Sequence, residues 1–406
     1  MPLFTPSLDD ALERIRTINP KDYASSRNFL AGAVTKISPY VTHGFISLAD
    51  VVAEIESNYP AEECEKLIME FGWREFFQHV WRHKGDHILR DLKPGLPGIK
   101  YLPELPRDIV EARTGIPVID GAVRELYETG YLHNHARMWL ASYVVHIRKV
   151  HWRSGADWMY GYLLDGDLAS NHLSWQWVAA TFSSKPYLFN ADNVARYAPH
   201  WASPKTAIDV SYETLDLIAR GGQAVAAEWG SETIKPYEVR SLFAMPPPQY
   251  GIPPNAAPDL VFGDMNEVAN IRLIHPWDLA EPLLAPSDAA AGVKKIGLIH
   301  APFHAQFPWS EKRWTFVLSR MQAITNTIFI GDLNRLLPAL RQASQSVECH
   351  VTETYYSGYR EALEAANILI TPVRRFTQDP EKCYSSFTSF WSAIGRQKLR
   401  RKWHRS

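Results

Sequence analysis

The segment 165–177 concentrates side chains that could do chemistry. It reads DGDLASNHLSWQW, so two carboxylates, two amides and two indoles lie within thirteen residues. This mixture suits neither a plain core helix nor a plain solvated helix. Calcium-binding loops also carry closely spaced aspartates, but they need glycine at the sixth position and glutamate at the twelfth. The segment has neither, which excludes a calcium site.

A second candidate group lies in the sequence HNHARM, residues 133–138. Asn134 and Met138 are one helical turn apart and share a face, with Arg137 beside them. An arginine buried in an apolar helix needs a carboxylate partner. Asp165 and Asp167 are the candidates for that partner.

Two further groups lie on predicted helices. Glu70 and Trp73 are three residues apart, so they share a face that could grip a flat polar ligand. From spacing alone, a helix whose Glu70 points to solvent is the favoured alternative. His79 and its neighbours at 83 and 87 step by four, but no glutamate follows His79 as in a metalloprotease, so we predict no metal site.

The loop 34–40 could bind an anion. Ser38 followed by Pro39 is a good start for a helix, whose free N–H groups and dipole favour negative charge. Thr35, Lys36 and Ser38 could add side-chain donors to a phosphate. Most starts of this kind only cap a helix, so the loop alone is a weak signal.

Composition bounds the class of protein. The chain has 406 residues with 46% hydrophobic and 21% charged content, which is typical of a soluble globular protein with two or three domains. The net charge of -1 does not indicate a nucleic-acid binder. We expect no disulfide framework from three scattered cysteines. Without a long apolar run or a secretory signal, we predict no membrane span and a cytoplasmic protein.

Patterning divides the chain into four parts. Apolar residues recur at helical spacing in 67–83, 118–150 and 156–164, and predict a helical domain over 1–200. A Pro-rich linker and connecting segment follows, 201–265. Strand-like runs at 295–300, 327–330, 348–352 and 367–371 alternate with helical stretches at 311–323, 334–343 and 359–365, which predicts a smaller parallel α/β domain over 266–395. A basic tail, 396–406, ends the chain.

Taken together, these segments resemble the photolyase/cryptochrome family in its helical FAD-binding domain. The order and spacing of short blocks carry the match, which covers about residues 8–200. The matching blocks are Tyr23 with Thr35–Tyr40, Trp73–Phe76, Thr114–Asp120, His133–Met138, Trp152–Gly155, Asp165–Ala169 and Trp175–Trp177.

The resemblance implies FAD, held in a folded form. Thr35, Ile37 and Ser38 would line its phosphates, although Val34 departs from the family's usual hydroxyl residue. Arg137 and Asp165 would form an ion pair over the isoalloxazine. Asn171 would face flavin N5, where photolyases favour asparagine. The implied cofactor-binding residues are Tyr23, Thr35, Ile37, Ser38, Arg137, Asp165, Asp167 and Asn171.

The resemblance also implies a cavity for a pyrimidine dimer flipped out of UV-damaged DNA. Stacking on indoles and hydrogen bonds from amide and carboxylate groups suit that task. Enzymes for (6-4) photoproducts place histidine where Asn134 and Met138 stand, so a cyclobutane dimer is favoured. The residues that would line this cavity are Glu70, Trp73, Asn134, Met138 and Trp177.

The family's electron-transfer chain is only partly matched. Trp175 and Trp152 correspond to its inner two tryptophans. The outermost member should fall near Ile99, where Tyr101 is the aromatic residue available. His135 also departs, because photolyases often carry an arginine there that contacts DNA phosphate.

The C-terminal region resembles the antenna domain that normally precedes the helical one. Cys383–Trp391 is similar to the segment that closes that domain, and Ile296–His300 with 309–321 resembles an early strand and helix. This predicts a circularly permuted photolyase, with an unrelated α/β module as the alternative. The region is shorter than a typical antenna domain, so a second, light-harvesting chromophore is doubtful.

The sequence therefore predicts a helical photolyase-type domain followed by an α/β domain. The implied function is blue-light-driven splitting of cyclobutane pyrimidine dimers by electron transfer from reduced FAD. The alternative is a cryptochrome-like photoreceptor without repair activity, whose signalling partner is unknown. Asn171, Glu70 and Trp73 favour repair, while His135 and the incomplete tryptophan chain favour signalling.

Overall fold

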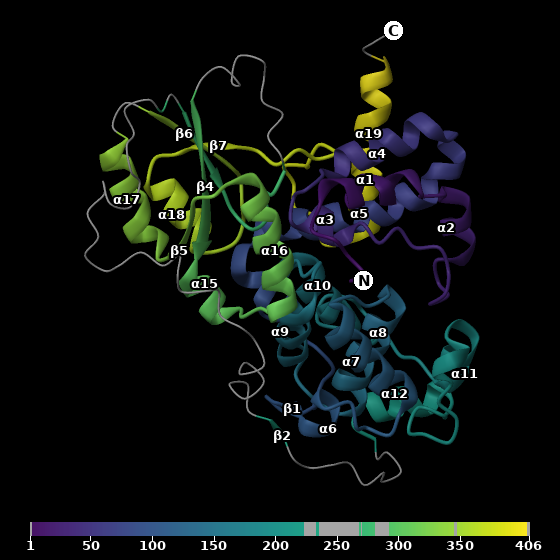
Figure 1. The fold of residues 1–406 in the computed structure, drawn as a ribbon. Helices are drawn as coiled ribbons and strands as arrows, with labels where there is room; N and C mark the ends of the chain where they lie inside the picture. Colours follow the sequence, from purple (N-terminus) through teal and green to yellow (C-terminus); the bar gives the residue numbers. More distant parts are fainter. Residues whose placement is uncertain are drawn as a thin grey trace.

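A computed structural model describes residues 2–222, 233–234, 268, 270–280, 292–344 and 347–403. It contains a helical module, residues 2–222, and an α/β module, residues 270–371, which lie beside each other (Figure 1). This confirms the predicted fold class of a helical domain with a smaller parallel α/β domain. The predicted Pro-rich stretch, 245–258, lies outside the described residues.

The first helices of the helical module begin at well-formed caps. Ser7 accepts a hydrogen bond from the Asp10 N–H, and Asn19 caps the next helix at Pro20. The fifth helix is the longest of them and ends at Gly85, whose φ is 53°. These elements are α1 (Leu8–Arg16), α2 (Pro20–Ser26), α3 (Ser38–Thr42), α4 (Leu48–Asn58), α5 (Ala61–Lys84) and η1 (Gly85–Leu89).

The predicted apolar run 118–150 is broken into separate helices. Gly130 ends the first of them in the left-handed conformation, with φ of 69°, and His133 caps the next. The elements of this half are α6 (Arg107–Val110), α7 (Pro117–Thr129), α8 (Asn134–Ser142), the π-helix η2 (Tyr143–Ile147), α9 (Trp152–Tyr162), α10 (Leu168–Val178), α11 (Ala191–Tyr197), η3 (Pro199–Trp201) and α12 (Tyr212–Ala219).

The α/β module is built on one parallel sheet. Its strands are β3 (Asn270–Ile274), β4 (Val293–His300), β5 (Ile328–Gly331), β6 (Glu348–Thr352) and β7 (Leu369–Thr371), in the order β5-β4-β3-β6-β7. Numbered along the chain, this is the 3-2-1-4-5 order of a doubly wound fold. The helices that connect or follow these strands are α15 (Ala301–Gln306), α16 (Glu311–Ile324), α17 (Leu333–Ala343) and α18 (Tyr359–Ala365).

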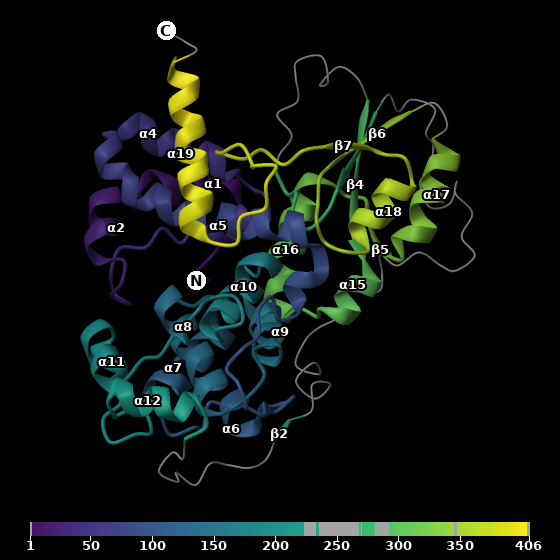
Figure 2. The same ribbon diagram turned by 180° about the vertical axis from the view of Figure 1, so that it is seen from behind.

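Segments at both predicted domain boundaries pack on the helical module. Helix α12 lies inside the predicted connecting segment, 201–265, and packs on the helical module: Lys149 donates from Nζ to the carbonyl of Ile218 in α12, at 2.6 Å. Further along the same segment, β2 (Thr233–Ile234) pairs antiparallel with β1 (Leu105–Pro106) of the helical module. After β7 the chain returns to the helical module, where α19 (Phe387–Trp403) lies along α5 (Figure 2). Residues 387–395, which we predicted within the α/β domain, therefore lie on α5.

Buried polar contacts hold the returning segment on α5. His79, which is fully buried, binds Asp379 through Nδ1 at 2.6 Å. Arg375 lies 3.4 Å from the carboxylate of buried Glu75. Gly72 gives room for the Trp391 ring, because a Cβ on Gly72 would lie 2.3 Å from it. His79, the first histidine of the series at 79, 83 and 87, is thus a buried contact between α5 and the returning segment.

Candidate functional site

An ion pair joins α8 to the loop before α10. Arg137 donates from Nη2 to both carboxylate oxygens of Asp165, at 3.0 and 2.8 Å. The hydroxyl of Ser38, the first residue of α3, donates to the same carboxylate at 2.6 Å. The Asp165 side chain is 4% exposed, so water screens the pair weakly. The structure thus supplies the carboxylate partner that Arg137 was predicted to need, although the Arg137 side chain is half-buried.

Asp167 caps α10 and binds two side chains of α5. It accepts from the Ser170 N–H at 2.7 Å and from Gln78 at 2.8 Å. Arg74 lies 3.8 Å from it. Sequence reasoning named Asp167 but missed Arg74 and Gln78 as its partners. The signal was available, because both follow Trp73 on the polar side of the same helix.

A cavity of about 190 Å³ lies beside these carboxylates. One side is apolar, with Met159, Leu163 and Val178, and another carries the Arg137–Asp165 pair. The hydroxyl of Ser170 is buried on its wall and has no hydrogen-bond partner in the described part of the chain. An apolar wall, a charged pair and an unsatisfied donor together suit a flat heteroaromatic ring with polar edges.

A second cavity of about 200 Å³ adjoins the first, because Asn134 lines both. It is lined by Tyr23, Thr35, Lys36 and Ser38. The hydroxyls of Tyr23 and Thr35 and the Lys36 ammonium can donate to an anion, whereas the Ser38 hydroxyl already donates to Asp165. Ile37 is different: it is 2% exposed and belongs to the core, outside the lining. Together the two cavities reach the range of about 300–1,000 Å³ that is typical of cofactor pockets.

The fit to FAD follows from this division. The polar cavity at the start of α3 provides donors for phosphates, and the apolar cavity provides walls for a ring system. Among the described residues, no group of three or more histidine, cysteine, aspartate or glutamate side chains could hold a metal ion. The donors of the polar cavity and the apolar walls of the other cavity together fit a dinucleotide of flavin type.

The five residues predicted to line a dimer cavity are only partly brought together. Asn134 is exposed and its amide lies 3.5 Å from the Met138 sulfur, and both line the apolar cavity. Glu70 lines the polar cavity and pairs with Lys66 at 2.7 Å. Trp73 lines neither cavity. Trp177 packs on Tyr187 and also lies outside both linings.

Trp73 is covered by the C-terminal helix. Its ring stacks on the ring of Phe387 from α19, with a centroid distance of 4.0 Å and an interplanar angle of 10°. Glu70, one turn before it, forms a second ion pair with Arg27 at 3.4 Å. Sequence reasoning could not find this cover, because Phe387 lies more than three hundred residues away in the chain.

The two tryptophans that the resemblance assigns to an electron relay, Trp175 and Trp152, are both buried. Trp175 lines the apolar cavity and lies against Gly155, where an added Cβ would be 2.3 Å from its ring. Trp152 is 2% exposed and donates its indole N–H to Asp91 at 2.6 Å. His151 lies between Trp152 and Tyr101, with centroid distances of 5.6 and 6.2 Å. Tyr101 is therefore placed as the next aromatic residue outward.

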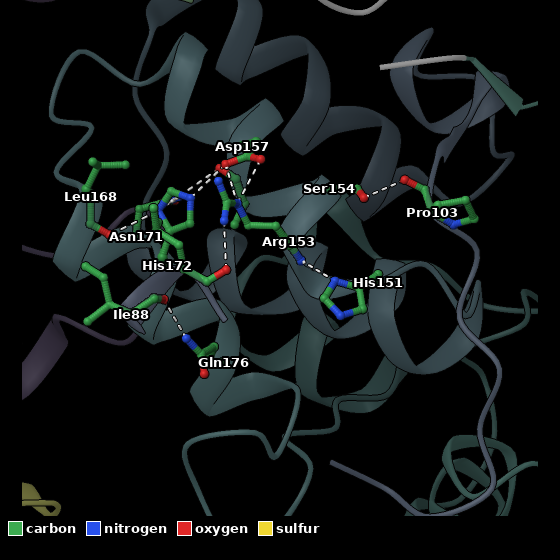
Figure 3. A network of polar contacts seen from close by, with 12 residues as sticks. Ile88, Pro103, His151, Arg153, Ser154, Asp157, Leu168, Asn171, His172 and Gln176 are labelled. Atoms are coloured by element: carbon green, nitrogen blue, oxygen red, sulfur yellow. Dashed lines mark hydrogen bonds and ion pairs between the residues drawn. The ribbon is translucent and has the colours of Figure 1, made fainter. Parts of the chain in front are cut away.

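A polar network behind the cavity fixes Asn171 (Figure 3). The Asn171 amide donates to the Ala156 carbonyl at 2.8 Å. The neighbouring His172 is fully buried and lies 2.9 Å from Asp157, which also binds Arg153. Burial alone would raise the pKa of Asp157, but the hydrogen bond and charge of His172 and the charge of Arg153 lower it. The network holds Asn171 at the cavity wall.

Comparison with known proteins agrees with this geometry. Residues 67–206 match the family described as the FAD binding domain of DNA photolyase. These residues are a photolyase-type FAD-binding domain. The cofactor of this domain is FAD, and the linings of the two cavities fit it.

Similar proteins include both photolyases and cryptochromes. A deoxyribodipyrimidine photo-lyase of Streptomyces griseus is 33% identical over 161 residues, covering 39% of this chain and 35% of its own. A cryptochrome DASH of Ostreococcus tauri is 30% identical over 208 residues, covering 47% and 38%. The crystal structure of a Synechocystis cryptochrome covers 58% of this chain and 55% of its own, with 23% identity and a TM-score of 0.46.

The likeness is confined to part of each relative. The chain spans about a third to a half of the length of the curated relatives it matches. Within the described residues, we find no helix with the length and apolar character needed to cross a bilayer.

Proposed function

We propose that this protein is a light-driven DNA repair flavoprotein that splits cyclobutane pyrimidine dimers. One observation carries the proposal: the exposed Asn134 and its neighbour Met138 stand at the rim of the cavity that holds the Arg137–Asp165 pair. A base that enters from solvent would meet an amide and a soft thioether before it reaches the flavin ring. The photo-lyase names of the relatives support the same reading.

Different residues of the chain would bind different parts of the cofactor. FAD, when bound and reduced, would supply the light-driven one-electron chemistry by which a dimer is split without net change in the flavin. Tyr23 and Thr35 would hold the phosphates through their hydroxyls, and Ser38 through its backbone N–H at the start of α3, because its hydroxyl already donates to Asp165. Arg137 with Asp165 would hold the ring. Asn171 would lie beside the ring. Trp175, Trp152 and Tyr101 would carry electrons from the surface when the flavin has to be reduced.

The test is a repair assay on the purified full chain. The protein, reduced with dithionite, is mixed with an oligonucleotide that carries one cyclobutane thymine dimer, and absorbance at 260 nm is followed under blue light. We expect absorbance to recover in the light and not in the dark. A preparation with full FAD occupancy that shows no recovery would contradict the repair function.

Asn134→Ala is expected to weaken dimer binding while FAD stays bound. The amide is exposed at the rim, so its loss removes hydrogen bonds to the base without opening the core. One such contact contributes about 1–2 kcal/mol, which corresponds to about tenfold in the dissociation constant. Fluorescence anisotropy with a labelled dimer oligonucleotide measures the dissociation constant, and flavin absorbance checks that the variant still binds FAD. If the variant binds the dimer oligonucleotide as tightly as the natural chain, Asn134 does not contact the dimer.

A cryptochrome-like photoreceptor is the second candidate, and α19 favours it. The Phe387 ring covers Trp73, so the indole predicted to stack on a flipped base already has a partner. His135 adds to this, because burial and then the charge of Arg27 lower its pKa. A neutral His135 offers no charge to a DNA phosphate.

Phe387→Ala distinguishes the two candidates. If α19 blocks the dimer surface, the variant exposes Trp73 and binds dimer-containing DNA more tightly than the natural chain, by about tenfold for one freed stacking surface of about 1–3 kcal/mol. Anisotropy titrations of both proteins measure the difference. Leu369→Ala, an exposed residue of β7, is the matched control. If Phe387→Ala leaves binding unchanged, α19 does not cover the dimer site.

A further inference from the structure

The α/β module contacts the loop that carries the two aspartates of the flavin site. Helix α16 begins beside this loop, and both views of the fold place it between the sheet and the helical module (Figures 1 and 2). The Ser310 N–H donates to the Gly161 carbonyl at 2.9 Å. Arg313, one turn further along α16, donates to the Tyr160 carbonyl at 2.7 Å and to the Gly166 carbonyl at 2.5 Å.

Arg313 has an unusual environment for a cation. Its side chain is fully buried, and in the described part of the chain it forms no ion pair with a carboxylate. The guanidinium lies over the rings of Trp309 at 3.9 Å and Tyr160 at 4.6 Å. Aromatic faces and carbonyl oxygens therefore replace the anion that a buried arginine normally requires.

The contact depends on a glycine between the two aspartates. A Cβ at Gly166 would lie 2.4 Å from Nη1 of Arg313 and 2.7 Å from the Tyr160 carbonyl. No side chain can be accommodated there without moving the guanidinium. The close approach of Arg313 to the backbone thus explains why glycine separates Asp165 from Asp167.

The same loop is held from α3 on its other side. His43 lies 2.9 Å from the Leu164 carbonyl and 2.6 Å from the Pro276 carbonyl of the α/β module. The Thr42 hydroxyl donates to the Asp165 carbonyl at 3.3 Å. The backbone carbonyls of the loop therefore bind groups outside it, while its carboxylates point to Arg137, Arg74 and Ser38.

We propose that Arg313 is a positioning residue of the flavin pocket, through which the α/β module holds Asp165 and Asp167 in place. The two guanidinium nitrogens of Arg313 bind the carbonyl of Tyr160, near the end of α9, and that of Gly166, between the two aspartates. The α/β module is then a structural part of the flavin site, whatever light-harvesting role it has. This inference concerns flavin binding and is independent of whether the protein repairs DNA or signals.

Arg313→Met tests the proposal in the dark and without DNA. We expect the dissociation constant of FAD from the apoprotein to rise about tenfold or more, the size of effect seen when contacts that support a ligating side chain are removed. Flavin fluorescence measures the constant. Amide hydrogen exchange of residues 161–167 is the second readout, and we expect it to speed up.

Arg320→Met is the matched control. Arg320 lies on the same helix, is 3% exposed, and donates to the Leu279 carbonyl rather than to the loop. A double-mutant cycle of Arg313→Met with Gly166→Ala adds a specific test, because both changes break one contact and their effects should not add. Equal FAD affinity and equal loop exchange in the Arg313 and Arg320 variants would overturn the proposal, as would additive effects in the cycle.

Discussion

Asp165→Asn is expected to yield a folded protein that has lost most of its FAD. The carboxylate is the one acceptor that Arg137 and Ser38 share, and it is 4% exposed. Asparagine keeps the shape but removes the charge, and its amide can present a donor to the guanidinium. Removing one partner of a buried pair costs about 3–5 kcal/mol. The lower end applies here because the Arg137 side chain is 24% exposed.

The apoprotein bears this stability cost as well, so FAD binding changes only by the contact that the charged pair makes with the cofactor. One hydrogen bond to a charged group contributes about 1.5–3 kcal/mol, which corresponds to about tenfold to a hundredfold in the dissociation constant of FAD. The ratio of flavin to protein absorbance after purification gives occupancy, and titration of the apoprotein gives the constant. Asp108→Asn is the matched control. Asp108 binds Arg148 through both oxygens, at 3.0 and 2.6 Å, but lines neither cavity. If both variants lose FAD equally, the effect belongs to general stability and Asp165 has no special part in binding.

The Arg137–Asp165 pair shows what could be predicted from sequence. A buried arginine needs an anion, and the aspartates of 165–167 were the candidates, so residue chemistry alone pointed to the contact. Local patterns also located β6 at 348–352 and α18 at 359–365 with the bounds that the structure has. These elements are short, apolar on one face and bounded by turn residues, which makes local sequence sufficient.

Other features depend on contacts between distant parts of the chain. β3 was missed, because its five residues include Asn270 and Arg272 and carry little strand signal outside the sheet. The stacking of Phe387 on Trp73 and the reach of Arg313 to Gly166 follow from how the modules pack. Ile37 was assigned to the phosphates by resemblance, yet its side chain lies in the core. Position in a motif does not by itself say which way a side chain points.

Acid is expected to unfold this protein well above the pKa range of its carboxylates. Several buried histidines, His43 among them, have a lowered pKa, and three are enough for the argument: burial lowers the pKa of His146 and of His133 to about 4, and lowers that of His304 well below 6.5. The geometry agrees, because Nδ1 of His146 and Nδ1 of His304 have no hydrogen-bond partner among the described residues. Protonation would place an unpaired charge in the interior.

The direction in which the free energy of unfolding changes with pH follows from proton uptake. Below pH 6.5 the unfolded chain protonates these histidines, while the native chain does not until the pH approaches their lowered pKa values. The unfolded state therefore binds more protons, and the free energy of unfolding falls as the pH falls from 6.5 to about 4. Each histidine contributes a slope of about 1.4 kcal/mol per pH unit, so three contribute about 4 kcal/mol per unit.

Two carboxyl groups oppose this trend. Burial raises the pKa of Glu75 despite the charge of Arg375, and raises the pKa of Glu125 despite the charge of Lys36. Their ionised forms disfavour the native state, and protonation relieves that cost, but two groups do not offset the histidines. Domains are stable by about 5–15 kcal/mol, so the loss between pH 6.5 and 4 is enough to unfold the chain.

Urea unfolding at a series of pH values, followed by tryptophan fluorescence, measures the slope. His146→Gln should lower the slope of the unfolding free energy against pH by the contribution of about one proton, because glutamine cannot titrate. Glutamine can still donate to the Val178 carbonyl, which lies 2.8 Å from the His146 ring. The exposed His87→Gln is the control and should leave the slope unchanged. A urea midpoint that stays constant from pH 7 to about 4.5 would mean that these histidines gain a proton in the folded chain, and that burial does not hold them neutral.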